Sequence, residues 1–300
     1  MDALAEKIIQ LKKEKNVFIM AHYYQKLEVQ DIADVVGDSY ALATLAQDAK
    51  QDTVILCGVR FMAESVKILN PDKTVYLSSA DAGCPMADMV TPEDVISLRR
   101  QYPDAAVMCY VNSSAAVKAV SDVCCTSSSA VRIAKAIPQK QIIFVPDQNL
   151  GAYVAAQVPE KEIILFDGYC PTHHRVTGND LRLAKEAHPS AAVLVHPECK
   201  EEVLKDADYI GSTAGILDFA MKTDAKELLI GTEIGVIDIL QRKLPNKKIY
   251  ALKSAFVCPN MKKTGLEDVL YCLEGKAAPI NLNDDEMNAA RASLERMIRI

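Results

Sequence analysis

Three cysteines in this chain are each followed by proline, and they recur at nearly equal intervals. Cys84 and Cys170 are 86 residues apart, and Cys170 and Cys258 are 88 residues apart. A period of this length is too long for a solenoid repeat and suits a small α/β unit. Three such units could each deliver one thiolate to a shared centre. Thiolates that meet at one point indicate a metal site.

Other features of the sequence recur with the same two increments. Apolar, strand-like segments at residues 17–22, 106–110 and 192–196 end in a reactive side chain, namely His22, Tyr110 and His196. Two further sets of strand-like segments are centred on Val54, Ile142 and Leu228, and on Val75, Ile163 and Ile249. Agreement between strands and cysteines indicates a triplicated unit.

This period divides the chain into three repeats, which we place at residues 1–87, 88–173 and 174–260. Residues 261–300 would then form C-terminal helices, the first of which is expected to close onto the first repeat. The predicted strands are rich in Val and Ile and do not alternate strictly with polar residues, which is typical of parallel sheets covered on both faces. We therefore predict an α/β fold of three pseudo-symmetric αβα units with short parallel sheets, packed around a central site.

The composition predicts an enzyme of the cytoplasm. A chain of 300 residues that is 50% hydrophobic can bury a large core, and it has no apolar segment near the ~20 residues that a membrane span needs. Residues 1–15 form a predicted amphipathic helix and lack the apolar region of a signal peptide. The net charge of −6, with scattered basic residues, argues against nucleic-acid binding and favours small-molecule partners.

Polar side chains follow the predicted strands at the edge where ligands bind in parallel sheets. Six of them come directly after the first strand of a unit: His22, Tyr24, Tyr110, Asn112, His196 and Glu198. A hydroxyl stands further along each unit: Ser39, Ser127 and Thr213. The hydroxyls are candidates for helix N-caps, for anion binding at helix N-termini, or for both.

The cysteines leave the nature of the metal open. Soft thiolates favour zinc or an iron–sulfur cluster, and zinc would need a fourth ligand such as His173 or His174. Three separated Cys-Pro sites favour a polynuclear metal cluster, such as a four-iron cluster with one iron left open as a Lewis acid. Five other cysteines are expected to be buried core residues: Cys57, Cys109, Cys124, Cys125 and Cys272. Cys199, close to His196, is not assigned.

Along nearly its whole length, the sequence resembles the quinolinate synthase A family of NAD biosynthesis. Eight segments carry the resemblance: MAHYYQ (20–25), QDIADVVGDS (30–39), GVRFMAESVKILNP (58–71), YVNSS (110–114), HPEC (196–199), GST (211–213), GTEIG (231–235) and CPNMKK (258–263). The resemblance implies condensation of iminoaspartate with dihydroxyacetone phosphate to quinolinate, with loss of phosphate and water. It also implies a [4Fe-4S] cluster bound by Cys84, Cys170 and Cys258.

The resemblance further implies which residues contact substrate: His22, Tyr24, Ser39, Tyr110, Asn112, Ser127, His196, Glu198, Ser212 and Thr213. Catalytic roles would fall on His22, Tyr24, Tyr110, His196 and Glu198. We expect His196 and Glu198, both with a pKa near neutral, to move a proton during the ketose-to-aldose shift of the triose. An enzyme that supplies iminoaspartate, L-aspartate oxidase or dehydrogenase, would be a functional partner.

A non-catalytic interpretation also remains open. The chain could be a three-domain protein that binds small anions, with a structural zinc held by the three cysteines and a histidine. The two interpretations differ in the metal, since an iron–sulfur cluster is brown and a zinc site is colourless.

Overall fold

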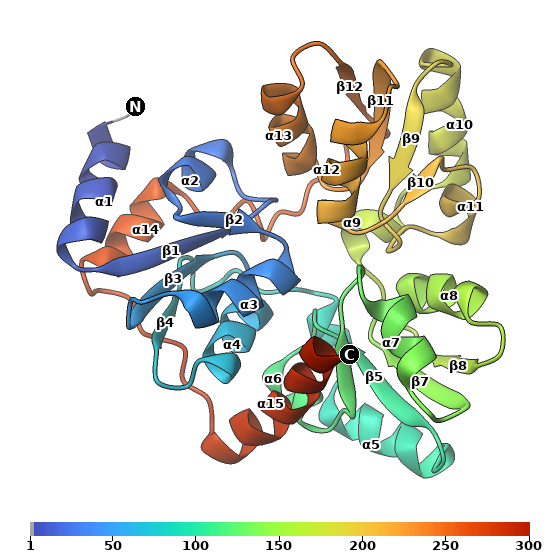
Figure 1. Ribbon diagram of the computed structural model, residues 1–300, viewed down its shortest axis with the longest axis horizontal. Coiled ribbons are helices and arrows are strands. Elements are labelled where there is room, and N and C mark those ends of the chain that lie inside the picture. Colours follow the sequence, from blue (N-terminus) through green and yellow to red (C-terminus); the bar gives the residue numbers. More distant parts are fainter. Residues whose placement is uncertain (1–2) are drawn as a thin grey trace.

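The structure is a computed structural model that describes residues 3–300, apart from the side chain of Tyr40. It has three lobes around a common centre, and each lobe contains one four-stranded parallel sheet (Figure 1). The first sheet has the strand order β2-β1-β3-β4, the second β6-β5-β7-β8 and the third β10-β9-β11-β12. The same order in all three sheets confirms the predicted triplicated α/β fold. Among residues 3–300, no helix is long and apolar enough to cross a membrane.

The elements follow one another in the same sequence in each repeat. The first repeat contains α1 (Ala3–Glu14), β1 (Val17–His22), α2 (Leu27–Ile32), β2 (Val35–Gly37), α3 (Ser39–Asp48), β3 (Thr53–Cys57), α4 (Arg60–Leu69) and β4 (Thr74–Leu77). The second contains η1 (Ala87–Met89), α5 (Pro92–Gln101), β5 (Ala106–Tyr110), α6 (Ala115–Ala119), β6 (Val123–Cys125), α7 (Ala130–Ala136), β7 (Gln141–Val145), α8 (Gln148–Gln157) and β8 (Glu162–Leu165). The short helix α9 (Pro171–His174) lies across the boundary between the second and third repeats. The third contains α10 (Gly178–Ala187), β9 (Ala192–Val195), α11 (Glu201–Leu204), β10 (Tyr209–Ile210), α12 (Thr213–Lys222), β11 (Glu227–Gly231), α13 (Gly235–Lys243) and β12 (Lys248–Ala251).

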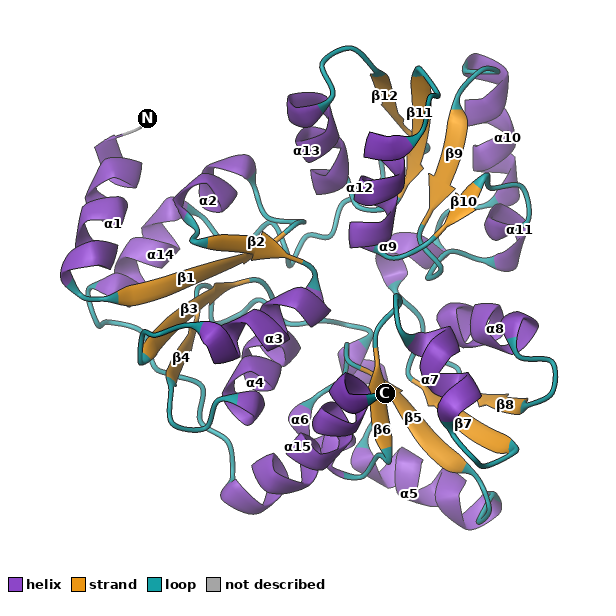
Figure 2. Ribbon diagram, in the orientation of Figure 1, coloured by secondary structure: helices purple, strands orange, loops and turns teal. Residues whose placement is uncertain are grey.

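Helices cover both faces of each sheet, as the apolar strands predict (Figure 2). In the first repeat, Val54 and Leu56 of β3 face a buried cluster with α3 and α4, whereas Ile55 faces another with α1 and α14 (Leu266–Leu273). The predicted N-terminal helix is α1, and residues 1–2 of that prediction lie outside the described residues. Burial on both faces makes each sheet a rigid base for the loops at its ends.

A short strand in each sheet was not predicted. These strands are β2, β6 and β10, with 3, 3 and 2 residues. An aspartate just before each of them, Asp34, Asp122 or Asp208, accepts a hydrogen bond from the backbone N–H of the neighbouring first strand, at 2.7–2.8 Å. The aspartate thereby fixes the register of a strand that is too short to be held by its own apolar residues.

The two C-terminal helices pack on different repeats. Helix α14 lies beside α1 on the first repeat, with Val269 and Leu273 buried in the same cluster as Ile8. Helix α15 (Asp284–Arg299) packs mainly against α6 and β6 of the second repeat and also contacts α4 of the first (Figure 1). The tail of the chain therefore ties the first lobe to the second.

We expect Leu294→Ala in α15 to lower the free energy of unfolding by about 2–5 kcal/mol, because Leu294 is fully buried in the core of the second repeat and its removal leaves a cavity. Urea denaturation of the whole chain measures this. The matched control is Leu183→Ala on α10, where the side chain is half exposed and the change should stay within about 0.5 kcal/mol. Equal effects of the two substitutions would contradict the packing of α15.

Candidate active site

The carboxyl ends of the strands from all three lobes meet at one cavity of about 210 Å³. His22 ends β1, Tyr110 ends β5 and His196 directly follows β9, so the same strand of each repeat contributes one of these side chains. The cavity is lined by twelve of the thirteen predicted site residues: His22, Tyr24, Ser39, Cys84, Tyr110, Asn112, Ser127, Cys170, His196, Glu198, Thr213 and Cys258. The thirteenth, Ser212, lies outside this cavity, in a neighbouring hollow, and caps α12 by accepting the Gly215 N–H.

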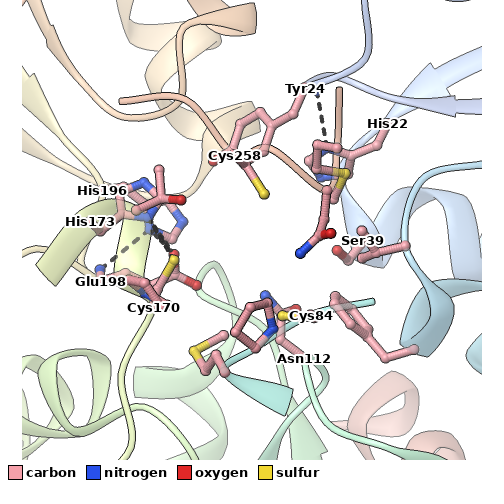
Figure 3. A pocket seen from close by; sticks show the side chains of 18 of the residues that line it. His22, Tyr24, Ser39, Cys84, Asn112, Cys170, His173, His196, Glu198 and Cys258 are labelled. Atoms are coloured by element: carbon pink, nitrogen blue, oxygen red, sulfur yellow. Dashed lines mark hydrogen bonds and ion pairs between the residues drawn. The ribbon is translucent and has the colours of Figure 1, made fainter. Parts of the chain in front are cut away.

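The sulfur atoms of Cys84, Cys170 and Cys258 point into the same space (Figure 3). Each cysteine stands in the loop that follows the fourth strand of its sheet, and all three are free thiols. Burial raises the pKa of the Cys84 thiol to about 12, and it also raises the pKa of Cys170 and Cys258. Without a metal the thiols are therefore protonated, and metal binding must release their protons.

Among the described residues, possible ligand atoms of Cys170, His173 and Glu198 lie within 4.8 Å of one another. His173 Nδ1 is 3.2 Å from Cys170 Sγ and 2.8 Å from a Glu198 carboxylate oxygen. The other predicted candidate, His174, points away, stacking on Tyr169 and bonding to Asn149. Of the two histidines, only His173 is placed to support a thiolate.

A chain of hydrogen bonds joins the repeats beside the cavity. The Tyr24 hydroxyl lies 2.9 Å from both the Thr213 and the Thr232 hydroxyls, and Thr232 lies 3.0 Å from His173 Nε2. Because His173 Nδ1 faces the Glu198 carboxylate, an N–H at Nδ1 can donate to that carboxylate, while Nε2 meets the Thr232 hydroxyl. The chain can orient, or pass, a proton between Tyr24 and Glu198.

His22 and His196 are held in the same way. In each, Nδ1 accepts a backbone N–H from two residues further on, at Tyr24 and Glu198 respectively. Burial lowers the pKa of His22 to about 3, assisted by Lys262. Both rings are thus neutral, and the proton sits on Nε2, which in His196 lies 3.3 Å from Ser127 Oγ.

The expectation that His196 and Glu198 have pKa values near neutral is wrong. Burial lowers the pKa of His196 to about 4, against the opposing charge of Glu198. Burial alone would raise the pKa of Glu198, but the imidazoles of His196 and His173 and the Tyr110 hydroxyl outweigh it, and the pKa is lowered to about 2. At neutral pH Glu198 is therefore a carboxylate beside the neutral ring of His196. Burial, and next the charge of Glu198, raises the pKa of Tyr24 and Tyr110, so these phenols remain donors.

The repeated hydroxyls are not N-caps. Helix α3 is capped by Asp38 and helix α12 by Ser212, so Ser39 and Thr213 are the first helical residues. In the second repeat Ser129 precedes α7, and Ser127 lies two residues earlier. All three hydroxyls line the cavity, which leaves them available to a ligand.

Asn112 carries an independent sign of a ligand. Its Oδ1 is buried, lacks a hydrogen-bond partner among the described residues, and belongs to a side chain that lines the cavity (Figure 3). Buried polar atoms without partners are rare in folded proteins, so a ligand group that reaches Asn112 would supply a missing hydrogen bond.

Thr232 is a site residue that the sequence analysis did not single out. It stands directly after β11, and the equivalent residues of the other repeats are Gly58 and Pro146. Because neither of these has a polar side chain, comparison of the repeats does not indicate a role for Thr232. The segment GTEIG, which contains it, was one of the segments that carried the family resemblance.

Comparison with known proteins agrees with this geometry. Residues 6–299 match the family described as Quinolinate synthetase A protein. The chain belongs to this family. A quinolinate synthase of Caldicellulosiruptor saccharolyticus is 50% identical over 300 residues, covering 100% of this chain and 99% of that protein. Quinolinate synthases of Clostridium kluyveri and Methanoregula boonei are 49% and 47% identical, each over 99% of this chain and 98% of the relative. The quinolinate synthetase A family is thus a family of enzymes.

We expect Thr232→Val to lower the free energy of unfolding by about 1–3 kcal/mol, because Tyr24 and His173 would both lose a buried partner. Urea denaturation measures the change. Thr74→Val, on the exposed start of β4, is the control and should have little effect. If the two variants unfold alike, the hydrogen-bond chain beside the cavity does not contribute to stability.

Proposed function

We propose that this protein condenses iminoaspartate with dihydroxyacetone phosphate to form quinolinate, with release of phosphate and water, as a step of NAD biosynthesis. The observation that carries the proposal is the convergence of one thiol from each repeat on a cavity that also holds the polar residues implied by the family. An enzyme that produces iminoaspartate, such as L-aspartate oxidase or dehydrogenase, would supply the first substrate.

The donor set fits a [4Fe-4S] cluster. A single zinc ion needs its ligands at about 2.0–2.3 Å, so all ligand atoms must lie close together. The close group around Cys170 comprises His173 and Glu198, and the thiols of Cys84 and Cys258 approach the same space from other lobes. A metal cluster, which is larger than a single ion, could be bound by all three thiols. When bound, such a cluster supplies a Lewis acid for the loss of water.

The protein's own residues would divide the remaining work. Glu198, held as a carboxylate, is in the form that accepts a proton, and the neutral His196 is in the form that donates one from Nε2. Together they would serve the ketose-to-aldose shift of the triose. Tyr24 and His22 would assist proton movements in ring closure. The hydroxyls of Ser39, Ser127 and Thr213, together with the Asn112 amide, would orient the phosphate and carboxylate groups.

One observation favours a second candidate. The group formed by Cys170, His173 and Glu198 could hold a single ion, and the protein would then be a zinc-containing protein that binds small anions. Anaerobic purification separates the two candidates, since a brown protein with equimolar iron and sulfide supports the cluster, and a colourless zinc protein supports the alternative.

We also propose that residues 1–87, 88–173 and 174–260 are the three structural units, with residues 261–300 as a C-terminal extension. The common strand order of the three sheets supports this division.

Removing any one of the three cysteines should abolish the cluster. We expect Cys84→Ala, Cys170→Ala and Cys258→Ala to contain little iron or sulfide per chain after anaerobic reconstitution, because each repeat supplies one ligand. Cys57→Ala and Cys272→Ala are controls, since both thiols are buried in the core of the first repeat, away from the cavity. A full and stable cluster in any of the first three variants would exclude the ligand assignment.

Glu198→Gln should lower turnover by ~10²–10⁴ without loss of iron, because it removes a proton acceptor but keeps the side chain's shape. If the step impaired is enolisation of the ketose, glyceraldehyde 3-phosphate should partly restore the rate in place of dihydroxyacetone phosphate. An equal defect with both trioses would assign Glu198 to a later step, and full activity would deny it a catalytic role.

A further inference from the structure

The loops that carry Cys84, Cys170 and Cys258 are each held within their own repeat by the same backbone hydrogen bond. The donor is a backbone N–H at the start of α4, α8 or α13, the helices that follow β3, β7 and β11. The acceptor is the carbonyl of the residue two positions before the cysteine. These bonds are Arg60 to Ala82, Gln148 to Gly168 and Ile234 to Phe256, at 2.8–2.9 Å. Their recurrence in all three repeats shows that the shared fold supplies one common backbone tie to each of these loops.

The second and third repeats add a side-chain tie to the cysteine itself. Asp147 Oδ2 accepts the Cys170 backbone N–H at 2.9 Å, and Glu233 Oε1 accepts the Cys258 N–H at 3.3 Å. The two carboxylates stand at the same position of their repeats, directly before the residues that make the backbone tie. Both are fully buried.

The other oxygen of each carboxylate binds the start of a helix. Asp147 Oδ1 accepts the Leu150 N–H, and Glu233 Oε2 accepts the Gly235 N–H, each at 2.7 Å. Lys262 also lies 3.1 Å from the Glu233 carboxylate and donates to the Tyr24 carbonyl at 2.6 Å. Each carboxylate therefore bridges a rigid helix and a cysteine loop.

The first repeat lacks this bridge. Val59 occupies the same position, and it precedes α4 without any side-chain cap. Two conclusions follow. A helix can begin here without a carboxylate, so capping alone does not explain Asp147 and Glu233. In addition, the Cys84 loop is held by the backbone tie without help from this position.

We infer that Asp147 and Glu233 are positioning residues that fix Cys170 and Cys258 for metal binding, and that Cys84 is the least constrained of the three ligands. As far as it concerns a cluster, this inference rests on the proposed function. Hydrogen-bonded residues that orient metal ligands commonly affect metal affinity 10–100-fold.

The first test uses the whole chain without metal. Iodoacetamide labelling of each cysteine is followed by peptide mass spectrometry in Asp147→Asn and Glu233→Gln. An amide can present only one acceptor oxygen, so one of the two bridging bonds is lost. We expect Cys170 to be labelled faster in the first variant and Cys258 in the second, each on the order of fivefold, with Cys84 unchanged.

Two further variants separate position from charge and from capping. Glu233→Asp keeps the charge but shortens the reach to the Cys258 N–H, so fast labelling of Cys258 supports positioning, and a wild-type rate denies it. Asp94→Asn is the matched capping control, because Asp94 closes the exposed N-terminus of α5 and lies on the surface. It should leave all three cysteines at wild-type rates.

The second test measures release of ferrous iron to a chelator after anaerobic reconstitution with iron and sulfide. Asp147→Asn and Glu233→Gln should lose iron 10–100-fold faster than wild type and Asp94→Asn. A wild-type protein that takes up no cluster would contradict the proposed function, while the labelling rates still decide the inference. Unchanged labelling of Cys170 and Cys258, or equal acceleration at every cysteine, would overturn it.

Discussion

The arrangement of three parallel sheets with the carboxyl ends of their strands around one cavity is the constraint on which the site depends. Loops at that end of a parallel sheet face the same direction, so one fold repeated three times delivers three loops to one point. The sheets can hold that geometry because helices bury both faces of their central strands. The chain begins in the first lobe, and its last helix, α15, packs on the second lobe. This contact links the two lobes at the end of the chain.

Within the cavity, the charge of Glu198 organises the electrostatics. Its carboxylate is buried, and burial of an ion without partners is costly, so the site surrounds it with the His173 ring, the Tyr110 hydroxyl and the His196 ring. The same charge contributes to the raised pKa of Tyr24 and of the thiols of Cys84 and Cys170. A metal centre in the cavity would lower the pKa of the thiols, because it would bind them as thiolates and release their protons.

Much of this could be predicted from the sequence, because long apolar strands and cysteines leave strong periodic signals. The limits of β1 and β5 agree with the predicted segments, and the cysteines line one cavity as their spacing indicated. Other features depend on contacts that sequence periodicity does not encode. Strand β10 is two residues long and is held by the Asp208 side chain, and the low pKa of His196 arises from burial between lobes. The caps on α3 and α12 lie one residue away from the repeated hydroxyls, a shift smaller than the error of any boundary read from sequence.

The three repeats show how a symmetric backbone supports an asymmetric site. The features that build the fold are the same in each copy, including the aspartate before the short strand and the backbone tie to each cysteine loop. The side chains that line or support the cavity differ. One position of the repeat carries His22, Tyr110 and His196, which line the cavity, and another carries Val59, Asp147 and Glu233. The two substrates proposed above, a dicarboxylate and a phosphate ester, would need different partners on each side. A threefold repeat meets this need because the fold fixes where side chains stand, and each copy remains free to change which side chain stands there.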